Sequence, residues 1–225
     1  RTDCPEIFDI SETPYFEDFN LYTASTSYYT YAATNETPSC WDIYSNGTAG
    51  STAAYWPRIY KGTSYCPTNN DNALLMYVCN YTGTTASSLG YVTERGTEKM
   101  AVLPPVSEPL SNVTISFDAK VYTVSTSVID TIFIAIPTSD STYIPLAHYQ
   151  GISGLIEIEE NLANYASIID TLTIENPRIA IVFKASTYTT SSLRANYLGI
   201  DNVQIAKNSS CPHPSNAIIT SVTSN

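Results

Sequence analysis

The sequence predicts an all-β protein, built as a two-sheet antiparallel β-sandwich of the jelly-roll kind. About eight to ten short runs are continuously apolar or alternate between apolar and polar residues, and turn-forming residues separate them. No stretch keeps the apolar period of about 3.6 residues that indicates an amphipathic helix. Strands of this length without helices to cover them bury their apolar faces by stacking as two sheets.

Five strands are expected in the first half of the chain, at residues 15–19, 40–44, 54–60, 73–79 and 99–103. Pro14 delays the first strand because a proline keeps its predecessor extended. Pro57 confines the third to a sheet edge or a bulge. The fourth is the longest apolar run of this half and is expected to be central. We expect the Tyr- and Thr-rich segment 21–38 to be a long surface loop.

Five more strands are expected in the second half, at residues 110–122, 128–136, 152–158, 178–185 and 197–206. The first of them alternates, so one of its faces is apolar and the other wet. Pro137 is expected to end the second, and residues 162–165 to form a short turn. We interpret residues 1–13 as a linker from a preceding domain, 14–207 as the sandwich, and the Ser/Thr-rich 208–225 as a linker into a following domain.

Composition narrows the class of partner. The 225 residues and 43% apolar content suffice for a packed core. Ten basic residues against 21 acidic ones give a net charge of −11, which repels phosphate backbones, so nucleic acid is not expected as a partner. Only 14% of residues are charged, as in proteins that work outside the cell. No run approaches the roughly 18 apolar residues of a membrane span, so we expect no direct membrane insertion.

The five cysteines are an odd number and match no zinc ribbon or redox pattern. Cys66 and Cys79 flank one loop and strand and could form a disulfide. Cys4 and Cys211 each precede a proline near the two ends of the chain and could also meet. Alternatively, Cys40 and Cys79 are small buried hydrophobic residues inside strands, the interpretation we favour for those two.

Acidic residues stand in the first and last expected strands, where a half-buried strand normally carries apolar ones. Glu17 and Asp18 belong to the first strand and Asp201 to the last. A buried carboxylate is costly unless it is paired or coordinates a cation, and calcium takes six to eight oxygen ligands. Asp71 and Asn69, just before a central strand, could add oxygens. We therefore expect a structural calcium ion there; the alternative is that these are solvated strand ends and turn formers.

Catalytic residues are scarce, whereas residues suited to binding are abundant. His148 and His213 are the only histidines, and no G-x-S-x-G motif accompanies them, so we expect no enzyme. Aromatic rings near Asn and Asp hold sugar rings by stacking and hydrogen bonds. The candidates for such contacts in or beside loops are Trp56, Tyr28, Tyr29, Tyr60 and Tyr65. The alternative is that such rings pack in the core, as we expect for Trp41.

Six motifs occur in an order that resembles the cleaved-adhesin domains of bacterial surface proteins. They are Tyr15-Phe16-Glu17-Asp18-Phe19, Cys40-Trp41, Asn72-Ala73-Leu74-Leu75-Met76, Ala101-Val102-Leu103-Pro104-Pro105-Val106, Ile115-Ser116-Phe117-Asp118-Ala119-Lys120 and Ile200-Asp201-Asn202-Val203. The resemblance implies a jelly roll related to MAM domains and carbohydrate-binding modules, with a structural calcium. It also implies an extracellular or bacterial cell-surface location. Residues 211–216 are similar to the opening of fibronectin type III repeats.

Together these observations predict a non-catalytic carbohydrate-binding or adhesin module that binds a glycan or a host or cell-surface glycoprotein. Neighbouring domains of the same chain are its other expected partners. The alternative is a structural spacer without a ligand of its own. Departures from the family pattern, such as Asn20 where relatives often carry glycine, leave the ligand itself unspecified.

Overall fold

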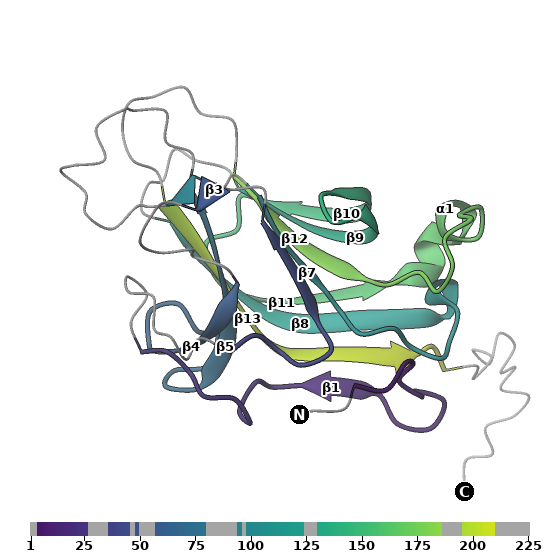
Figure 1. Cartoon of the computed structure of the whole chain (residues 1–225), viewed down its shortest axis with the longest axis horizontal. Helices are drawn as coiled ribbons and strands as arrows, with labels where there is room; N and C mark the ends of the chain where they lie inside the picture. The colour runs from purple at the N-terminus through teal and green to yellow at the C-terminus, as the bar shows by residue number, and fades with distance from the viewer. Residues whose placement is uncertain are drawn as a thin grey trace, which may run out of the picture.

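Two antiparallel sheets packed face to face form the protein (Figure 1). The computed structural model describes residues 4–26, 36–45, 48–49, 57–79, 94–95, 98–123, 130–185 and 195–209. Within them, helix is limited to two 3-10 turns, η2 (Leu110–Asn112) and η3 (Leu162–Tyr165), and one α-helical turn, α1 (Ala166–Ile169). The predicted all-β sandwich is therefore confirmed.

The first sheet has six strands and contains both the first and the last strand of the fold. Its order is β11-β8-β13-β5-β4, and β1 also pairs with β13. The strands are β1 (Tyr15–Glu17), β4 (Arg58–Lys61), β5 (Asn72–Cys79), β8 (Val113–Thr123), β11 (Gly154–Asn161) and β13 (Ala195–Lys207). Figure 1 shows β1 lying along β13, so the expected meeting of the first and last strands is confirmed.

The second sheet has five strands in the order β10-β9-β12-β7-β2. They are β2 (Asp42–Ser45), β7 (Glu98–Val102), β9 (Thr131–Ser139), β10 (Thr142–Gln150) and β12 (Ala180–Lys184). A separate two-stranded ribbon joins β3 (Thr48–Ala49) to β6 (Glu94–Arg95).

The core lies between the two sheets and is filled by alternate residues of their strands. Phe117 and Ile200 reach into it from the six-stranded sheet, and Ile134 and Phe183 from the five-stranded one. Trp41 is buried there as expected, with its Nε1 donating to the Tyr15 hydroxyl at 2.7 Å. Successive strand residues point to opposite faces, so the residues between these core positions form the two outer faces.

Besides the two-residue strands β3 and β6, which fall in segments read as turns, the sequence interpretation missed β10 and shortened β9, both around prolines. β10 was not predicted because Pro145 interrupts it, yet it is an edge strand whose register shifts between Pro145 and Ala147. Edges and bulges are where a sheet tolerates proline. Pro137 does not end β9, which continues to Ser139. Because pairing with β12 stops at Ala135, the missing N–H of Pro137 removes no bond to that strand.

The N-terminal segment, residues 4–13, is packed on the sandwich. A disulfide joins Cys4 to Cys40, and Phe8 exchanges backbone hydrogen bonds with Pro105 and Ser107. Ile10 is buried in the core. Cys4 therefore pairs with Cys40, whereas the sequence interpretation favoured Cys40 as a small buried hydrophobic residue and suggested Cys211 as a possible partner of Cys4. Cys211 and the rest of the expected C-terminal linker from residue 210 lie outside the described residues.

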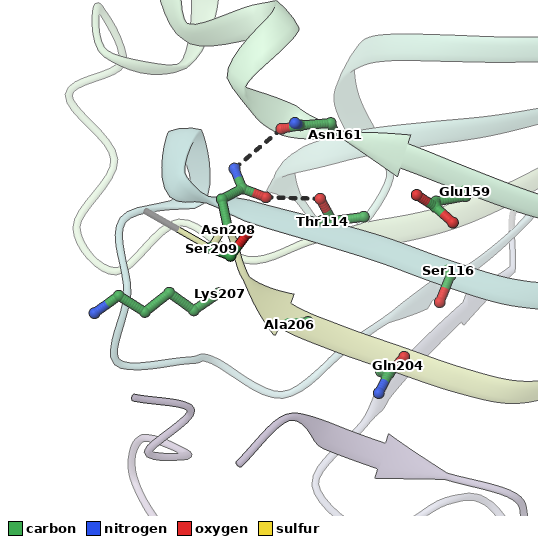
Figure 2. Close-up of a pocket in the computed structure, with 9 residues that line it drawn as sticks. All are labelled: Thr114, Ser116, Glu159, Asn161, Gln204, Ala206, Lys207, Asn208 and Ser209. Carbon is green, nitrogen blue, oxygen red and sulfur yellow. Dashed lines mark hydrogen bonds between the residues drawn. The ribbon is translucent and has the colours of Figure 1, made fainter. Parts of the chain in front are cut away.

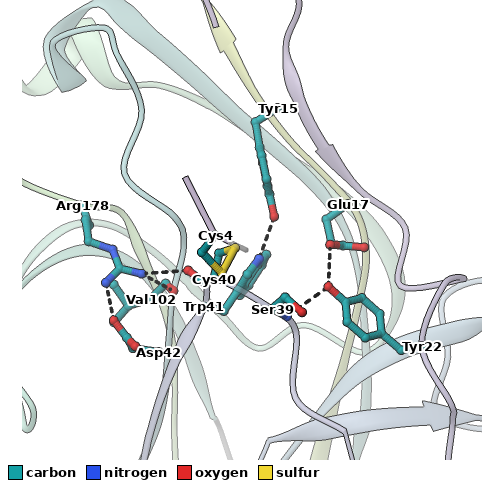
Figure 3. The surroundings of a disulfide bond; sticks show 10 residues. All are labelled: Cys4, Tyr15, Glu17, Tyr22, Ser39, Cys40, Trp41, Asp42, Val102 and Arg178. Carbon is teal, nitrogen blue, oxygen red and sulfur yellow. Dashed lines mark hydrogen bonds and ion pairs between the residues drawn. A yellow bond between two sulfur atoms is a disulfide. The ribbon is translucent and has the colours of Figure 1, made fainter. Parts of the chain in front are cut away.

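Arg178 fixes the chain around this disulfide (Figure 3). Its guanidinium donates to the carbonyl oxygens of Cys40 and Val102, both at 3.2 Å, and forms an ion pair with Asp42. Its Nε donates to the Leu103 carbonyl at 2.6 Å. One side chain thus ties the residues around β2 to the end of β7.

No helix among the described residues is long and apolar enough to cross a bilayer.

Candidate functional site

A bulge in β13 turns one acidic side chain out of the core. β8 pairs with one edge of β13, and the register of this pairing shifts between Asp201 and Gln204 of β13. Asn202, within the shift, has a φ of 51°. A bulge inserts an extra residue and so changes which side chains face inward. Before the bulge, Asp201 lies opposite Asp118 on the outer face; after it, Val203 is buried between the sheets.

Three other carboxylates lie within electrostatic reach of Asp201 at this bulge. Asp201 is only 1% exposed, and burial raises its pKa to about 7, partly opposed by the Asn202 N–H that donates to its Oδ1 at 2.8 Å. The negative charges of Asp71, Asp118 and Asp18 raise that pKa as well. Like charges disfavour ionisation of a buried carboxyl, so this cluster is electrostatically suited to a cation.

The backbone around the cluster is held in an uncommon conformation. β1 and β5 pair with successive parts of the same edge of β13, so the end of one strand meets the start of the other. Asn72 joins them, because its Nδ2 donates to the carbonyl oxygens of Phe19 and Tyr22, both at 3.0 Å. Phe19 has a φ of 58° and Asn70 one of 63°. Left-handed conformations of non-glycine residues cluster at functional sites.

The segment before Asp71 covers the outer face of the six-stranded sheet. Lys120 on β8 donates from Nζ to the carbonyl oxygens of Thr63 at 2.9 Å and Cys66 at 3.0 Å. The Tyr65 carbonyl oxygen lies so near Gly199 that a Cβ there would be 1.9 Å from it. This close approach requires glycine at position 199.

Of the five residues expected to bind calcium, the structure brings Asp18 and Asp71 within electrostatic reach of Asp201. Glu17 lies apart, because it pairs with Val203, which faces the interior, and its carboxylate accepts from the Phe19 N–H and the Tyr22 hydroxyl. Asn69 is exposed. As the side chains stand, no three His, Cys, Asp or Glu among the described residues form a group that could hold a metal ion.

Two of the tyrosines expected to hold a sugar are buried. Tyr60 is 6% and Tyr65 7% exposed, and their ring centroids are 5.7 Å apart. Tyr65 also packs against Tyr122 and Tyr197, at 5.0 and 4.5 Å. Contrary to expectation, these two rings have no open face for a ligand, because they pack the covering segment onto the sheet. Trp56, Tyr28 and Tyr29 lie outside the described residues.

A different set of rings lies on the outer face of the five-stranded sheet. Tyr44, Phe133 and Tyr143 pack on a small apolar cluster of that face, with Phe133 and Tyr143 centroids 5.9 Å apart and His148 6.4 Å from Phe133. We call these four residues the aromatic face. The Tyr143 hydroxyl donates to Glu98 at 3.1 Å, and burial with this negative charge raises its pKa.

A groove of about 240 Å³ runs beside the aromatic face. Tyr44 lines it, and burial together with the charges of Asp42 and Asp140 raises the pKa of that tyrosine. Glu175 and Asn176 line it too, and neither makes a hydrogen bond to any described residue. An aromatic ring can stack on a sugar, and neighbouring carboxylate and amide groups that make no other hydrogen bond can bind its hydroxyls.

Comparisons with known proteins give similarities to solved structures alone, since no family model and no curated protein matches the chain. One similar structure is a family 11 carbohydrate-binding module from Clostridium thermocellum in complex with a β-1,3-1,4-mixed-linked tetrasaccharide. It shows 16% identity and a TM-score of 0.40, over 77% of this chain and 92% of that one.

Another is the glycoside hydrolase domain of Endo-D from Streptococcus pneumoniae R6, with 10% identity and a TM-score of 0.38. That match covers 75% of this chain but 22% of the other. The K1 cleaved adhesin domain of Lys-gingipain from Porphyromonas gingivalis W83 is similar over 88% of this chain and 99% of that domain, with 11% identity and a TM-score of 0.48. A cleaved-adhesin domain is thus among the solved structures that this chain is similar to, as its motifs led us to expect.

Proposed function

We propose that this chain is a non-catalytic carbohydrate-binding or adhesin module of a secreted or cell-surface bacterial protein. Its ligand is a glycan, free or on a host or cell-surface glycoprotein. The observation that carries the proposal is the aromatic face with its adjoining groove. Outer faces of a sandwich are normally wet, so three partly buried rings gathered on one of them point to a ligand with flat apolar surfaces and many hydroxyls.

The groove supplies the polar half of such a site. Tyr44 offers a ring, while Asp140, Glu175 and Asn176 offer acceptors and a donor in the lining of the same groove. Arg178 also lines the groove and is held in place, because its guanidinium already binds Asp42 and the Cys40 and Val102 carbonyls. A rigid wall lowers the entropy that a ligand loses on binding.

The proposed location outside the cell is supported by the disulfide between Cys4 and Cys40. Disulfides persist in oxidising compartments and are rare in the cytosol. Neighbouring domains of the same protein are proposed as further partners. Such domains would act as spacers between the module and the cell.

A glycan array tests the proposal, with wild type compared to Tyr44→Ala and Phe133→Ala. We expect each variant to lose most of the binding of at least one class of glycan, because stacking on a ring contributes a large part of sugar affinity. Ile168→Ala, an exposed apolar residue on α1, is the matched control and should bind as wild type does. If the folded wild type binds no glycan on the array, the result would instead support the spacer function.

We further propose that a structural calcium ion binds at the β13 bulge, with Asp18, Asp71 and Asp201 as ligands and Asp118 beside them. What supports this is the donor chemistry, since all four are carboxylates, and the raised pKa of the buried Asp201. The second oxygen of Asp201 accepts no hydrogen bond from any described residue. Binding of the ion would bring the carboxylates of Asp18, Asp71 and Asp201 closer together than they stand in this structure.

Melting curves in calcium and in chelator test the ion, because a ligand that binds only the folded state raises its stability. We expect chelation to lower the melting temperature, added calcium to restore it, and Asp201→Asn to abolish the difference. Asp170→Asn, an exposed acid remote in sequence from the cluster, should keep the full response. Equal melting temperatures of the wild type in calcium and chelator would contradict the proposal.

A further inference from the structure

The outer face of the six-stranded sheet carries a hollow of about 590 Å³ (Figure 2). It lies on the opposite sheet from the aromatic face. Its lining comes from β8, β11, β13 and the residues just after β13: Thr114, Ser116, Glu159, Asn161, Gln204, Ala206, Lys207, Asn208 and Ser209. The volume falls within the range in which proteins hold small ligands, about 300–1,000 Å³.

One end of the hollow is fixed by Asn208. Its side-chain oxygen accepts from the Thr114 hydroxyl at 2.7 Å, and its Nδ2 donates to Asn161 Oδ1 at 3.0 Å. Its backbone N–H donates to the Asn112 carbonyl at 2.9 Å. The two side-chain bonds tie the end of β13 to its neighbour β8 and, beyond β8, to the end of β11, as the dashed lines in Figure 2 show. This wall is therefore preorganised.

The other end carries polar groups that are not used within the fold. Glu159, Ser116 and Gln204 stand side by side on three adjacent strands, since Ser116 is the register partner of both others. None of the three side chains makes a hydrogen bond or ion pair with another residue that the structure describes. A row of a carboxylate, a hydroxyl and an amide is thus open to a ligand (Figure 2).

The charge of the hollow is negative. The ammonium group of Lys207 points away from the row in Figure 2 and forms an ion pair with Glu108 at 2.7 Å. The Glu159 carboxylate is therefore the one uncompensated charge among the lining residues that the structure describes. Such a site repels anions and accepts hydrogen bonds from hydroxyl groups.

An exposed ring extends the same row. Phe16 on β1 is the register partner of Gln204, so it lies next to it on the same face of the sheet, and it is 51% exposed. It offers an apolar plane beside the three polar groups.

We propose that this hollow is a second saccharide site, specific for neutral sugars. The two oxygens of Glu159 accept from adjacent hydroxyls of one sugar ring, Ser116 and Gln204 bind the next, and Phe16 stacks on its apolar face. The inference goes beyond the proposed function, which concerns the opposite sheet. A chain with both sites is bivalent and can bridge two glycans.

The experiment uses an array of neutral and sialylated glycans and the Tyr44→Ala/Phe133→Ala variant, which lacks the first site. We expect this double variant to keep binding to a subset of neutral glycans. Adding Glu159→Gln should weaken that binding about tenfold or more, and adding Phe16→Ala about three- to tenfold. Glu157→Gln, on the same face of β11, is the matched control and should change nothing. Melting curves verify that each variant folds.

The outcomes separate the two sites. If the double variant binds no glycan, or if Glu159→Gln and Phe16→Ala leave its binding unchanged, the second site is refuted and the proposed function stands on the first alone. If the double variant binds as the wild type does and Glu159→Gln removes that binding, the hollow is the glycan site and the aromatic face is not. Equal binding of sialylated glycans through the hollow would refute the charge argument and the proposal with it.

Discussion

Removing the disulfide between Cys4 and Cys40 should destabilise the domain by an amount that follows from the loop it closes. The two cysteines are 36 residues apart in sequence. Closing a loop of that length removes chain entropy from the unfolded state equivalent to about 4 kcal/mol at ~25 °C. We therefore expect the Cys4→Ser/Cys40→Ser variant to lose about 3–4 kcal/mol of its free energy of unfolding.

The folded state should survive this change, because other contacts hold the same segments. Phe8 and Ile10 keep residues 5–13 on the sandwich, and Arg178 still binds the carbonyl of residue 40. Cys40 has a φ of 70°, a conformation that glycine adopts without strain. Cys4→Ser/Cys40→Gly should therefore recover about 1 kcal/mol relative to the serine variant.

Urea unfolding followed by tryptophan fluorescence measures both differences, with the free thiols alkylated after unfolding to exclude new disulfides. A serine variant within about 1 kcal/mol of the wild type would refute the loop-entropy reasoning. A glycine variant less stable than the serine variant would show that the left-handed backbone at residue 40 is imposed by the disulfide rather than by the surrounding fold (Figure 3).

Three further predictions concern the covered part of the six-stranded sheet. Gly199→Ala should lower the free energy of unfolding by about 1–3 kcal/mol in urea titrations, because its Cβ would meet the Tyr65 carbonyl. In chelator, the melting temperature should rise as the pH falls from about 7 toward 4. The folded pKa of Asp201 exceeds its unfolded value, so the folded state binds the extra proton; Asp201→Asn should flatten this profile. Burial raises the pKa of Cys66 to about 11, so peptide mapping should find it unalkylated by iodoacetamide in the folded protein and alkylated after unfolding.

Much of the fold followed from local sequence signals. Alternation in β8 and the apolar run of β5 predicted these strands because side-chain period and burial act over a few residues. β10 was not predicted, since the effect of Pro145 depends on whether its strand lies at an edge, which only the sheet order decides. The partner of Cys4 depends on tertiary contacts in the same way.

The candidate sites were predictable in part. Acids in the first and last strands predicted a cluster, and the structure brings Asp18 within electrostatic reach of Asp201. Their role as calcium ligands stays a prediction. Asp118 was missed because it reads as the wet side of an alternating strand, and only pairing with β13 places it opposite Asp201. Phe133 was hidden inside an apolar run. To place it on the outer face next to Tyr143, one must know which alternate residues of β9 face outward and that β10 pairs with β9.

The bulge at Asn202 links the proposed calcium site to the proposed saccharide site in the hollow. It turns Asp201 outward into the acid cluster, and the residues beyond it hold β1, which is only three residues long. β1 carries Phe16 beside the hollow and ends at Glu17, directly before Asp18. Because so short a strand has few bonds of its own, its position depends on what holds the turn after it. Loss of a cation is therefore expected to weaken sugar binding at the hollow but not at the aromatic face, which glycan titrations of the site variants in chelator and in calcium would measure.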